Sequence, residues 1–245
     1  MDLNGRKAVI AGVGPGLGRE LALTFAAAGA DLALLARRAA VLDEVAATEP
    51  GALCLPTDLT DRARCAEAAR RIGERLGAVD VLVHNAFARP PLGSLGERTA
   101  AEWHAAVDGN LLSATNLLYE LLPLMRGRSA SVVLISSISA RMPHPGSGIY
   151  AAMKSAMLTL VQVLARELGP DGIRVNAVVP GYIESDNLEA FFGGPQPRRD
   201  AEAGTCLGRF VTAREVASVA AFFGSPASAG VTGQTLDVNA GQWFG

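Results

Sequence analysis

The sequence predicts an α/β fold in which helices cover both faces of a parallel sheet. Short apolar runs alternate with longer helical patterns along all 245 residues, an order typical of parallel strands joined by helical crossovers. Most of these runs are continuously apolar, as expected of strands that are buried on both faces. No Ser- or Pro-rich linker, internal repeat or block of like charge interrupts the alternation. We therefore expect residues 1–245 to form a single domain.

Seven apolar runs have the length and composition of strands, and all but the last precede a helical pattern. The expected strands are Lys7–Ala11, Asp31–Ala36, Ala52–Leu55, Val79–His84, Ser131–Ser136, Ile173–Val179 and Thr235–Val238. Capping boxes in Thr99–Glu102 and Thr212–Glu215 each predict a helix start. A long helix over Tyr150–Leu168 is expected to end at Gly169 and Pro170, which form a usual exit signal.

Composition and charge exclude several classes of protein. With 49% hydrophobic and 19% charged residues, the chain can bury a sizeable core and is not disordered. A net charge of −2 gives no electrostatic case for a nucleic-acid or anionic-membrane partner. No apolar run approaches the roughly 18 to 20 residues that span a bilayer, so we expect a soluble, cytoplasmic protein. The cysteines and histidines have no spacing typical of a disulfide scaffold or a metal site, and no metal is expected.

A glycine-rich turn follows the first strand. Backbone N–H groups and a helix N-terminus can approach a pyrophosphate only where residues lack a Cβ. The spacing G-x-x-x-G-x-G differs from the common G-x-G-x-x-G fingerprint, but strand, glycines and helix follow in the order of a dinucleotide site. A tight structural turn is the alternative. The candidate contacts are Gly12, Gly14, Gly16, Leu17 and Gly18.

The end of the second strand indicates which dinucleotide binds. A site selective for NAD usually has an acidic side chain there, to bind the ribose 2′-hydroxyl. Arg37 and Arg38 occupy this place, and Asp31 lies at the opposite end of the strand. Guanidinium groups can bind a 2′-phosphate bidentately. The prediction is therefore NADP(H), with NAD(H) as the alternative if both arginines only face solvent.

A tyrosine and a lysine stand four residues apart in the long helix. Tyr150 and Lys154 share one helical face, and a chance pairing is improbable because the chain has three tyrosines and two lysines. A cation held close favours phenolate and lowers the pKa of a phenol from its usual value of about 10. Tyr150 could then give a proton to a carbonyl oxygen or take one from an alcohol.

Two further polar residues are candidates for the same site. Ser137 ends the fifth strand, at the sheet edge where ligands bind, and its hydroxyl could hydrogen-bond a reacting oxygen. Asn110 is a polar residue in an apolar helical stretch, so its amide needs partners. Taken alone, a turn residue and a helix-packing residue are the ordinary interpretations.

Together these residues resemble the short-chain dehydrogenase/reductases, along essentially the whole chain. The resemblance implies a Rossmann-type, doubly wound sheet of seven parallel strands, and it makes Asn110, Ser137, Tyr150 and Lys154 a catalytic tetrad. It implies cofactor contacts at Asp58 and Leu59 for adenine, at Asn85 and Ala86 for the Asn-Asn-Ala-Gly motif, and at Pro180, Gly181, Ile183 and Ser185 around the nicotinamide. It also implies a homotetramer or homodimer, with the C-terminal strand near an interface.

Three residues depart from the motifs of this family. Ala11 replaces the usual threonine of the glycine motif, and His84 replaces the first asparagine after the fourth strand. Phe87 replaces the glycine that closes that motif. A benzyl side chain there requires either an altered backbone path or a ring that points into the cleft.

The segment Glu184–Gly208 combines turn formers with aromatic residues, and we expect it to be a long loop that acts as a substrate lid, at about residues 184–208. A surface excursion that merely connects elements is the alternative. A mainly apolar substrate pocket is expected from Phe87, Met142, His144, Tyr182, Leu188, Phe191 and Phe192.

The resulting hypothesis is an NADP(H)-dependent oxidoreductase that interconverts a ketone and a secondary alcohol. The alternatives are an NAD-dependent alcohol or hydroxysteroid-type dehydrogenase and, in a different class, a non-catalytic nucleotide-binding regulator. The residues favour neither an alicyclic, steroid-like ketone nor a 3-oxoacyl thioester as substrate.

Overall fold

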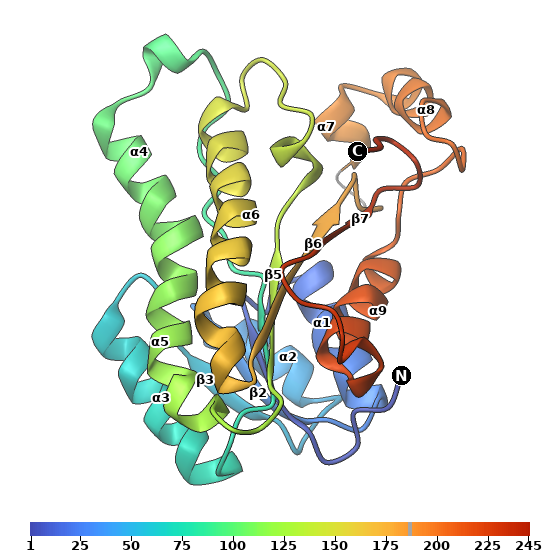
Figure 1. The fold of residues 1–245 in the computed structure, drawn as a ribbon. Helices are drawn as coiled ribbons and strands as arrows, with labels where there is room; N and C mark the ends of the chain where they lie inside the picture. The colour runs from blue at the N-terminus through green and yellow to red at the C-terminus, as the bar shows by residue number, and fades with distance from the viewer. Residues whose placement is uncertain (186–187) are drawn as a thin grey trace.

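The computed structural model describes residues 1–185 and 188–245, and it contains one seven-stranded parallel sheet with the strand order β3-β2-β1-β4-β5-β6-β7 (Figure 1). All six strand pairings are parallel. The predicted fold class is confirmed, and each strand ends within two residues of its expected bounds. The strands are β1 Lys7–Ala11, β2 Asp31–Ala36, β3 Leu53–Pro56, β4 Val81–His84, β5 Ser131–Ile135, β6 Arg174–Pro180 and β7 Thr235–Val238.

Helices cover both faces of the sheet, and each face has its own buried apolar layer (Figure 1). One face packs against α1 (Leu17–Ala27), α2 (Ala39–Ala46) and α9 (Ala213–Gly224). The other packs against α3 (Arg62–Leu76), α5 (Ser113–Met125) and α6 (Gly148–Leu168). This burial on both sides explains why the strands are apolar without alternation.

The strand order makes β1 the switch point of the sheet. β1 lies between β2 and β4, so the chain leaves the centre in both directions and opens a crevice beyond the carboxyl ends of these strands. Ala11 pairs with His84, and His84 pairs with Leu134. The residues that follow these strand ends therefore meet at one edge. In Figure 1, α4 (Ala100–Val107) rises above this edge on one side, and α7 (Leu188–Phe192) with α8 (Pro195–Ala203) on the other.

The segment 184–208 is not the irregular loop that its turn formers predict. Outside residues 186 and 187, which are not described, it holds the short helices α7 and α8. Pro195 stands in the first turn of α8, where its missing N–H costs no hydrogen bond. The turn formers therefore mark the break between two helices.

By length and composition alone, one described helix could cross a membrane, which the sequence did not lead us to expect. It is α6 with the turn after it, Gly148–Asp171, with a mean hydropathy of 1.4 over an 18-residue window. In the fold, however, α6 packs Met157, Val161 and Leu164 against the sheet. Its apolar character follows from its place in the core.

Both predicted capping boxes are present. The Thr99 hydroxyl accepts from the Glu102 N–H at 3.3 Å, and the Glu102 carboxylate accepts from the Thr99 N–H at 2.6 Å. Thr212 and Glu215 repeat the arrangement at 3.2 and 2.8 Å. These caps satisfy donors that the first helical turn leaves free.

Removal of the α9 cap tests its contribution to stability. Thr212→Ala leaves the Glu215 N–H without its partner, so we expect the free energy of unfolding to fall by about 1 kcal/mol. Urea unfolding followed by circular dichroism measures this change. Ser218→Ala, in the same helix, is the control and is expected to cost nothing, because alanine is the better helix former. Equal losses in the two variants would contradict the capping role.

Candidate active site

A cleft of about 1130 Å³ lies at the carboxyl edge of the sheet. The glycine turn forms one end, and the segments that follow β4, β5 and β6 form the other. Ser137 and every predicted cofactor contact line it. These contacts are Gly12, Gly14, Gly16, Leu17, Gly18, Arg37, Arg38, Asp58, Leu59, Asn85, Ala86, Tyr150, Lys154, Pro180, Gly181, Ile183 and Ser185.

The glycine turn has the geometry of a pyrophosphate cradle. A Cβ on Gly12 would lie 2.3 Å from the Ala86 backbone nitrogen, and one on Gly18 would lie 2.5 Å from the Gly12 carbonyl oxygen. Close packing of the turn against the β4 loop therefore requires glycine. Gly14 and Gly16, in contrast, face open space within 4 Å, at the N-terminus of α1. The residues present thus fit a bound dinucleotide.

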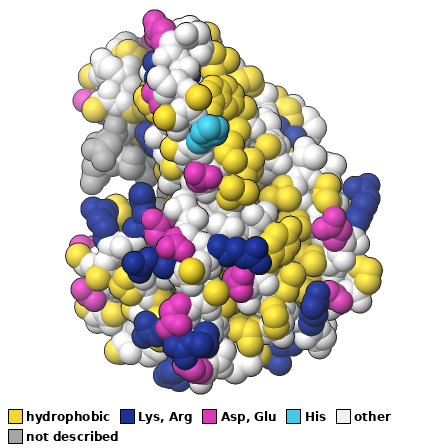
Figure 2. All heavy atoms as spheres, turned by 90° about the vertical axis from the view of Figure 1, so that its left-hand side faces the viewer, with side chains coloured by type: hydrophobic (Ala, Val, Ile, Leu, Met, Phe, Trp, Pro, Cys, Tyr) yellow, Lys and Arg dark blue, Asp and Glu magenta, His cyan; other side chains and the backbone are white. Residues whose placement is uncertain are grey.

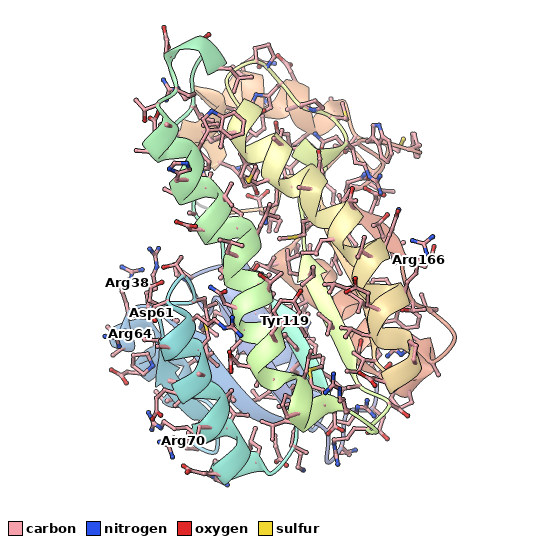
Figure 3. All side chains as sticks on the ribbon, turned by 60° about the vertical axis from the view of Figure 1, so that its left-hand side comes forward. Arg38, Asp61, Arg64, Arg70, Tyr119 and Arg166 are labelled. Carbon is pink, nitrogen blue, oxygen red and sulfur yellow. The ribbon has the colours of Figure 1, made fainter. Side chains whose placement is uncertain are left out.

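The part of the cleft beyond the carboxyl end of β2 holds a carboxylate and an arginine. Hydrogen bonds from Thr60 lower the pKa of Asp58, with further lowering by the charges of Arg37 and Arg64. Arg37 therefore lies near Asp58. Arg38 is the N-cap residue of α2, and Figure 3 shows its side chain projecting outward. No described carboxylate stands at the carboxyl end of β2, where one would favour a ribose 2′-hydroxyl.

Lys154 joins the site to the sheet. Its side chain is 2% exposed, and its Nζ donates a hydrogen bond to the Ile135 carbonyl at 2.9 Å. The Ser136 hydroxyl in turn donates to the Lys154 carbonyl at 3.0 Å. These two bonds fix α6 against the end of β5. They also hold Lys154 Nζ 5.7 Å from the centre of the Tyr150 ring, on the shared helical face.

Ser137 reaches the cleft from the turn after β5. Ser136 and Ser137 both line the cleft, and the Ser136 hydroxyl is also hydrogen-bonded to α6. Ser137 also begins the short helix Ile138–Ala140, where its hydroxyl accepts from the Ser139 N–H at 3.2 Å. Its side chain lies close enough to Tyr150 to oppose the rise in the pKa of that phenol. The two hydroxyls therefore converge on one place.

Burial governs the acidity of both members of the Tyr-Lys pair. Burial raises the pKa of Tyr150, while the hydrogen bond with Ser137 and the charge of Arg89 oppose this rise. Burial also lowers the pKa of Lys154 to about 7. The sequence led us to expect that Lys154 lowers the pKa of Tyr150, and the structure differs. An amine that is only partly charged at neutral pH has too little charge to offset desolvation of the phenol.

Asn110 lies behind the cleft and does not line it. It sits in a π-helical turn, Asp108–Leu112, that joins α4 to α5. Its Nδ2 donates to the carbonyls of Ala88 and Ala106, both at 2.9 Å. Asn110 thus anchors the loop after β4 to the helix, which is a positioning contact. Its Oδ1 is buried and has no partner among the described residues.

His84 is buried against the same π-helical turn. Its Nε2 lies 3.2 Å from the Ser113 hydroxyl, which itself donates to the Gly109 carbonyl at 3.0 Å. Ser113 has one proton to give, so His84 donates from Nε2 and its Nδ1 is a bare acceptor. Within the described ranges, Nδ1 has no partner. Burial lowers the pKa of His84 to about 3, and the charge of Lys154 adds to this effect.

The Phe87 ring points into the cleft, which decides between the two arrangements left open by the sequence. It lines the cleft and meets the Tyr150 ring at 6.2 Å in an edge-to-face arrangement. Lys154 Nζ lies 5.7 Å from the Phe87 ring centre, and the Arg89 guanidinium carbon lies 5.9 Å from it. Phe87 thus contacts both Tyr150 and Arg89.

Five of the seven residues expected in the substrate pocket line the cleft: Phe87, His144, Tyr182, Leu188 and Phe191. The other two do not. Met142 is 44% exposed outside it. Phe192 packs instead on Tyr182 at 4.9 Å and stacks on Phe210 at 5.4 Å. On a short helix, neighbouring aromatics point in different directions, so Phe191 and Phe192 cannot both face the substrate.

Leu92 and Asp108 line the cleft and were not among the residues predicted from the sequence. Arg89 lines it too; from the sequence it could meet an acidic substrate, although a solvated arginine is the ordinary interpretation. Its proximity to the motif Asn85–Phe87 was the available signal, because a residue two positions after a strand-end motif stays near the same sheet edge.

The pKa of His84 predicts a loss of stability in mild acid. An unfolded histidine has a pKa of about 6.5, whereas that of folded His84 is about 3. Between these values only the unfolded state binds the proton, so the stabilisation is complete above about pH 6.5 and decreases as the pH falls. Urea unfolding measures the free energy of unfolding at pH 7.5 and at pH 5. Between these pH values we expect it to fall by about 2 kcal/mol more in the wild-type chain than in His84→Asn. The same pH dependence in both chains would contradict a buried neutral imidazole.

Comparisons with known proteins identify the family of the chain. The family model described as Enoyl-(Acyl carrier protein) reductase matches residues 12–242. An uncharacterized short-chain type dehydrogenase/reductase of Sinorhizobium fredii is 36% identical over 254 residues, with 98% of each chain covered. The 3-oxoacyl-acyl-carrier-protein reductase of Escherichia coli is 33% identical over 250 residues, with 100% of each chain covered.

Solved structures give the same result. A short-chain type dehydrogenase/reductase from Mycobacterium ulcerans is 30% identical with a TM-score of 0.93, covering 99% of this chain and 91% of that one. A short-chain dehydrogenase/reductase from Brucella melitensis, described as a glucose/ribitol dehydrogenase, is 30% identical with a TM-score of 0.91, covering 99% and 98%. The chain therefore belongs to the short-chain dehydrogenase/reductase family, whose members are NAD(P)-dependent oxidoreductases acting on CH–OH and C=O groups.

Proposed function

We propose that the protein catalyses reversible, NADP(H)-dependent hydride transfer between nicotinamide C4 and a ketone or secondary alcohol. The observation that carries this proposal is the convergence of Ser137, Tyr150 and Lys154 on one cleft that also contains the glycine turn. A proton donor thus stands in the same cleft as a cradle for a dinucleotide.

In the reducing direction, each side chain has one task. Bound NADPH supplies the hydride. The Ser137 hydroxyl binds the carbonyl oxygen, and Tyr150 donates its proton to that oxygen. Lys154 holds the nicotinamide ribose, and its charged form favours the phenolate left behind. Asn110 keeps the loop after β4 in place and offers Oδ1 to a water that returns the proton through Lys154.

Tyr150 is protonated at neutral pH, which is the form that the reducing direction requires. A phenol that keeps its proton is ready to donate it, whereas alcohol oxidation requires the phenolate as base. The cofactor contacts would divide along the cleft. Arg37 and Arg38 would bind the 2′-phosphate, Asp58 and Leu59 the adenine, and Pro180, Gly181, Ile183 and Ser185 the nicotinamide.

The segment 184–208 would close the substrate side as a lid. Tyr182 contacts Phe191 at 5.8 Å and Phe210 at 5.4 Å, which ties α7 to the end of β6 through aromatic packing. Leu188 and Phe191 of α7 face the cleft. A lid of this kind would exclude water from the reacting carbon.

Exposed apolar side chains suggest how protomers would assemble. Figure 2 shows hydrophobic side chains gathered on the face that includes α4 and α5, where Leu112 and Tyr119 are 45% and 46% exposed. This face and the exposed Leu236 of β7 would join protomers in a homotetramer or homodimer.

The free thiols of Cys54, Cys65 and Cys206 would suit a cytoplasmic enzyme.

Substitution of Tyr150 tests the mechanism. Tyr150→Phe keeps the ring and removes the transferable proton, so we expect kcat to fall at least about a hundredfold. Consumption of NADPH, followed by absorbance with a panel of ketones, measures the effect. The control is the dissociation constant for NADPH, measured by its fluorescence, which should stay within about twofold because the 2′-phosphate contacts are untouched. Retained turnover with well-bound NADPH would refute the role of Tyr150.

Substitution of Arg37 tests the choice of coenzyme. Arg37→Ala removes the guanidinium at the end of β2, so we expect the ratio of kcat/KM for NADPH over NADH to fall by about tenfold or more. Arg64→Ala is a matched control, because Arg64 also acts on Asp58 but does not line the cleft. A wild-type chain that prefers NADH would identify the NAD-dependent alternative.

A further inference from the structure

Arg89 is the cation that stands closest to the reacting end of the cleft after Lys154 among the described lining residues. It follows the β4 motif and lines the cleft at its mouth. Its guanidinium lies over the Phe87 ring, and Phe87 meets Tyr150 edge to face. The positive charge and the phenol therefore both lie against the same aromatic ring. Phe87, the residue that departs from the family motif, provides this platform.

Arg89 has no carboxylate within 4.0 Å among residues 1–185 and 188–245. Glu184, which lines the same end of the cleft, is already engaged: Arg198 Nη2 lies 2.7 and 2.8 Å from its two carboxylate oxygens. Burial raises the pKa of Tyr150, and the charge of Arg89, together with the Ser137 hydrogen bond, opposes that rise. The charge of the guanidinium thus contributes to the electrostatic potential at the Tyr150 hydroxyl.

Arg89 is exposed at the mouth of the cleft. Leu92, Tyr182, Leu188 and Phe191 line the substrate side of the cleft with Phe87, and Asp108 adds a carboxylate to the lining. A ligand that fills the cleft removes part of the hydration of the guanidinium, and an anion on the ligand offsets that cost. Because the guanidinium is one ring away from Tyr150, the anion has to lie a few bonds from the carbonyl.

We propose that Arg89 binds a carboxylate on the substrate, so that the preferred substrates are short oxo acids and their hydroxy-acid products. The inference rests on the proposed function and narrows it. The planar guanidinium binds the two carboxylate oxygens side by side, while Ser137 and Tyr150 bind the ketone oxygen. A neutral ketone or the ester of the same acid lacks the first contact.

Two matched pairs of ketones test the inference: levulinate with methyl levulinate, and acetoacetate with methyl acetoacetate. We expect the wild-type chain to reduce each acid with kcat/KM at least about tenfold above that of its ester, mainly through KM. Arg89→Leu should remove this preference by raising KM for the acids and should leave the esters within twofold. Arg89→Lys should keep part of the preference for acids, because lysine retains the positive charge but lacks the two parallel N–H donors of the guanidinium.

Arg71→Leu controls for net charge, because Arg71 is exposed on α3 and does not line the cleft. It should leave all four substrates unchanged. If Arg89 acts only on Tyr150, Arg89→Leu will instead shift the pH profile of kcat for acids and esters alike, and this result would overturn the inference. Esters that are reduced as well as the acids by the wild-type chain would overturn it too.

Binding separates this inference from the proposed function. Tyr150→Phe with bound NADPH lacks the proton donor but retains Arg89, so quenching of the NADPH fluorescence reports ligand affinity without turnover. We expect Tyr150→Phe to bind levulinate at least about tenfold more tightly than methyl levulinate. In the double variant that also carries Arg89→Leu, we expect the two ligands to bind with equal affinity. Equal binding of acid and ester, or binding of neither, would overturn the inference. If the wild-type chain reduces no ketone but this preference for binding the acid is observed, the result would count against the proposed function alone.

Discussion

The structure depends on one buried cation, the ammonium of Lys154. The ammonium donates to the Ile135 carbonyl at the end of β5 and lies over the ring of Tyr150, while the Lys154 backbone carbonyl accepts from the Ser136 hydroxyl. A lysine that is 2% exposed is costly to bury, and burial lowers its pKa to about 7. The site therefore holds a group that gains or loses a proton near neutral pH at little cost.

This balance changes how the Tyr-Lys pair is understood. The sequence places a phenol and an amine on one helical face, and from that spacing alone the amine is the source of the phenol's acidity. The structure adds the surroundings, where apolar walls desolvate both groups and raise the pKa of Tyr150. In the proposed mechanism, the protonated phenol and the readily deprotonated amine would form a short relay, in which Lys154 would replace the proton that Tyr150 gives away. Arg89, outside the helix, modifies the potential at the phenol from the other side.

Much of the fold was predictable because it depends on local and periodic signals. Apolar runs identified all seven strands, the capping boxes at Thr99 and Thr212 located two helix starts, and the glycine spacing located the cradle. Side-chain direction was harder to predict. Phe191 and Phe192 are equally expected in the substrate pocket from the sequence, yet only Phe191 lines the cleft. The direction of each ring depends on where α7 begins. The proximity of Arg89 to Tyr150 depends on contacts between distant segments, which no local pattern reports.

The π-helical turn at Asp108–Leu112 has a consequence for how this region can change over evolution. A π turn contains one more residue than the α turn it replaces. Deletion of a single residue there would restore a regular helix and rotate all of α4 by about 100° relative to α5. The carbonyl of Ala106 would leave the Asn110 amide, and the loop held through Ala88 would lose its anchor. Indels in this stretch should therefore be rarer than its surface position suggests.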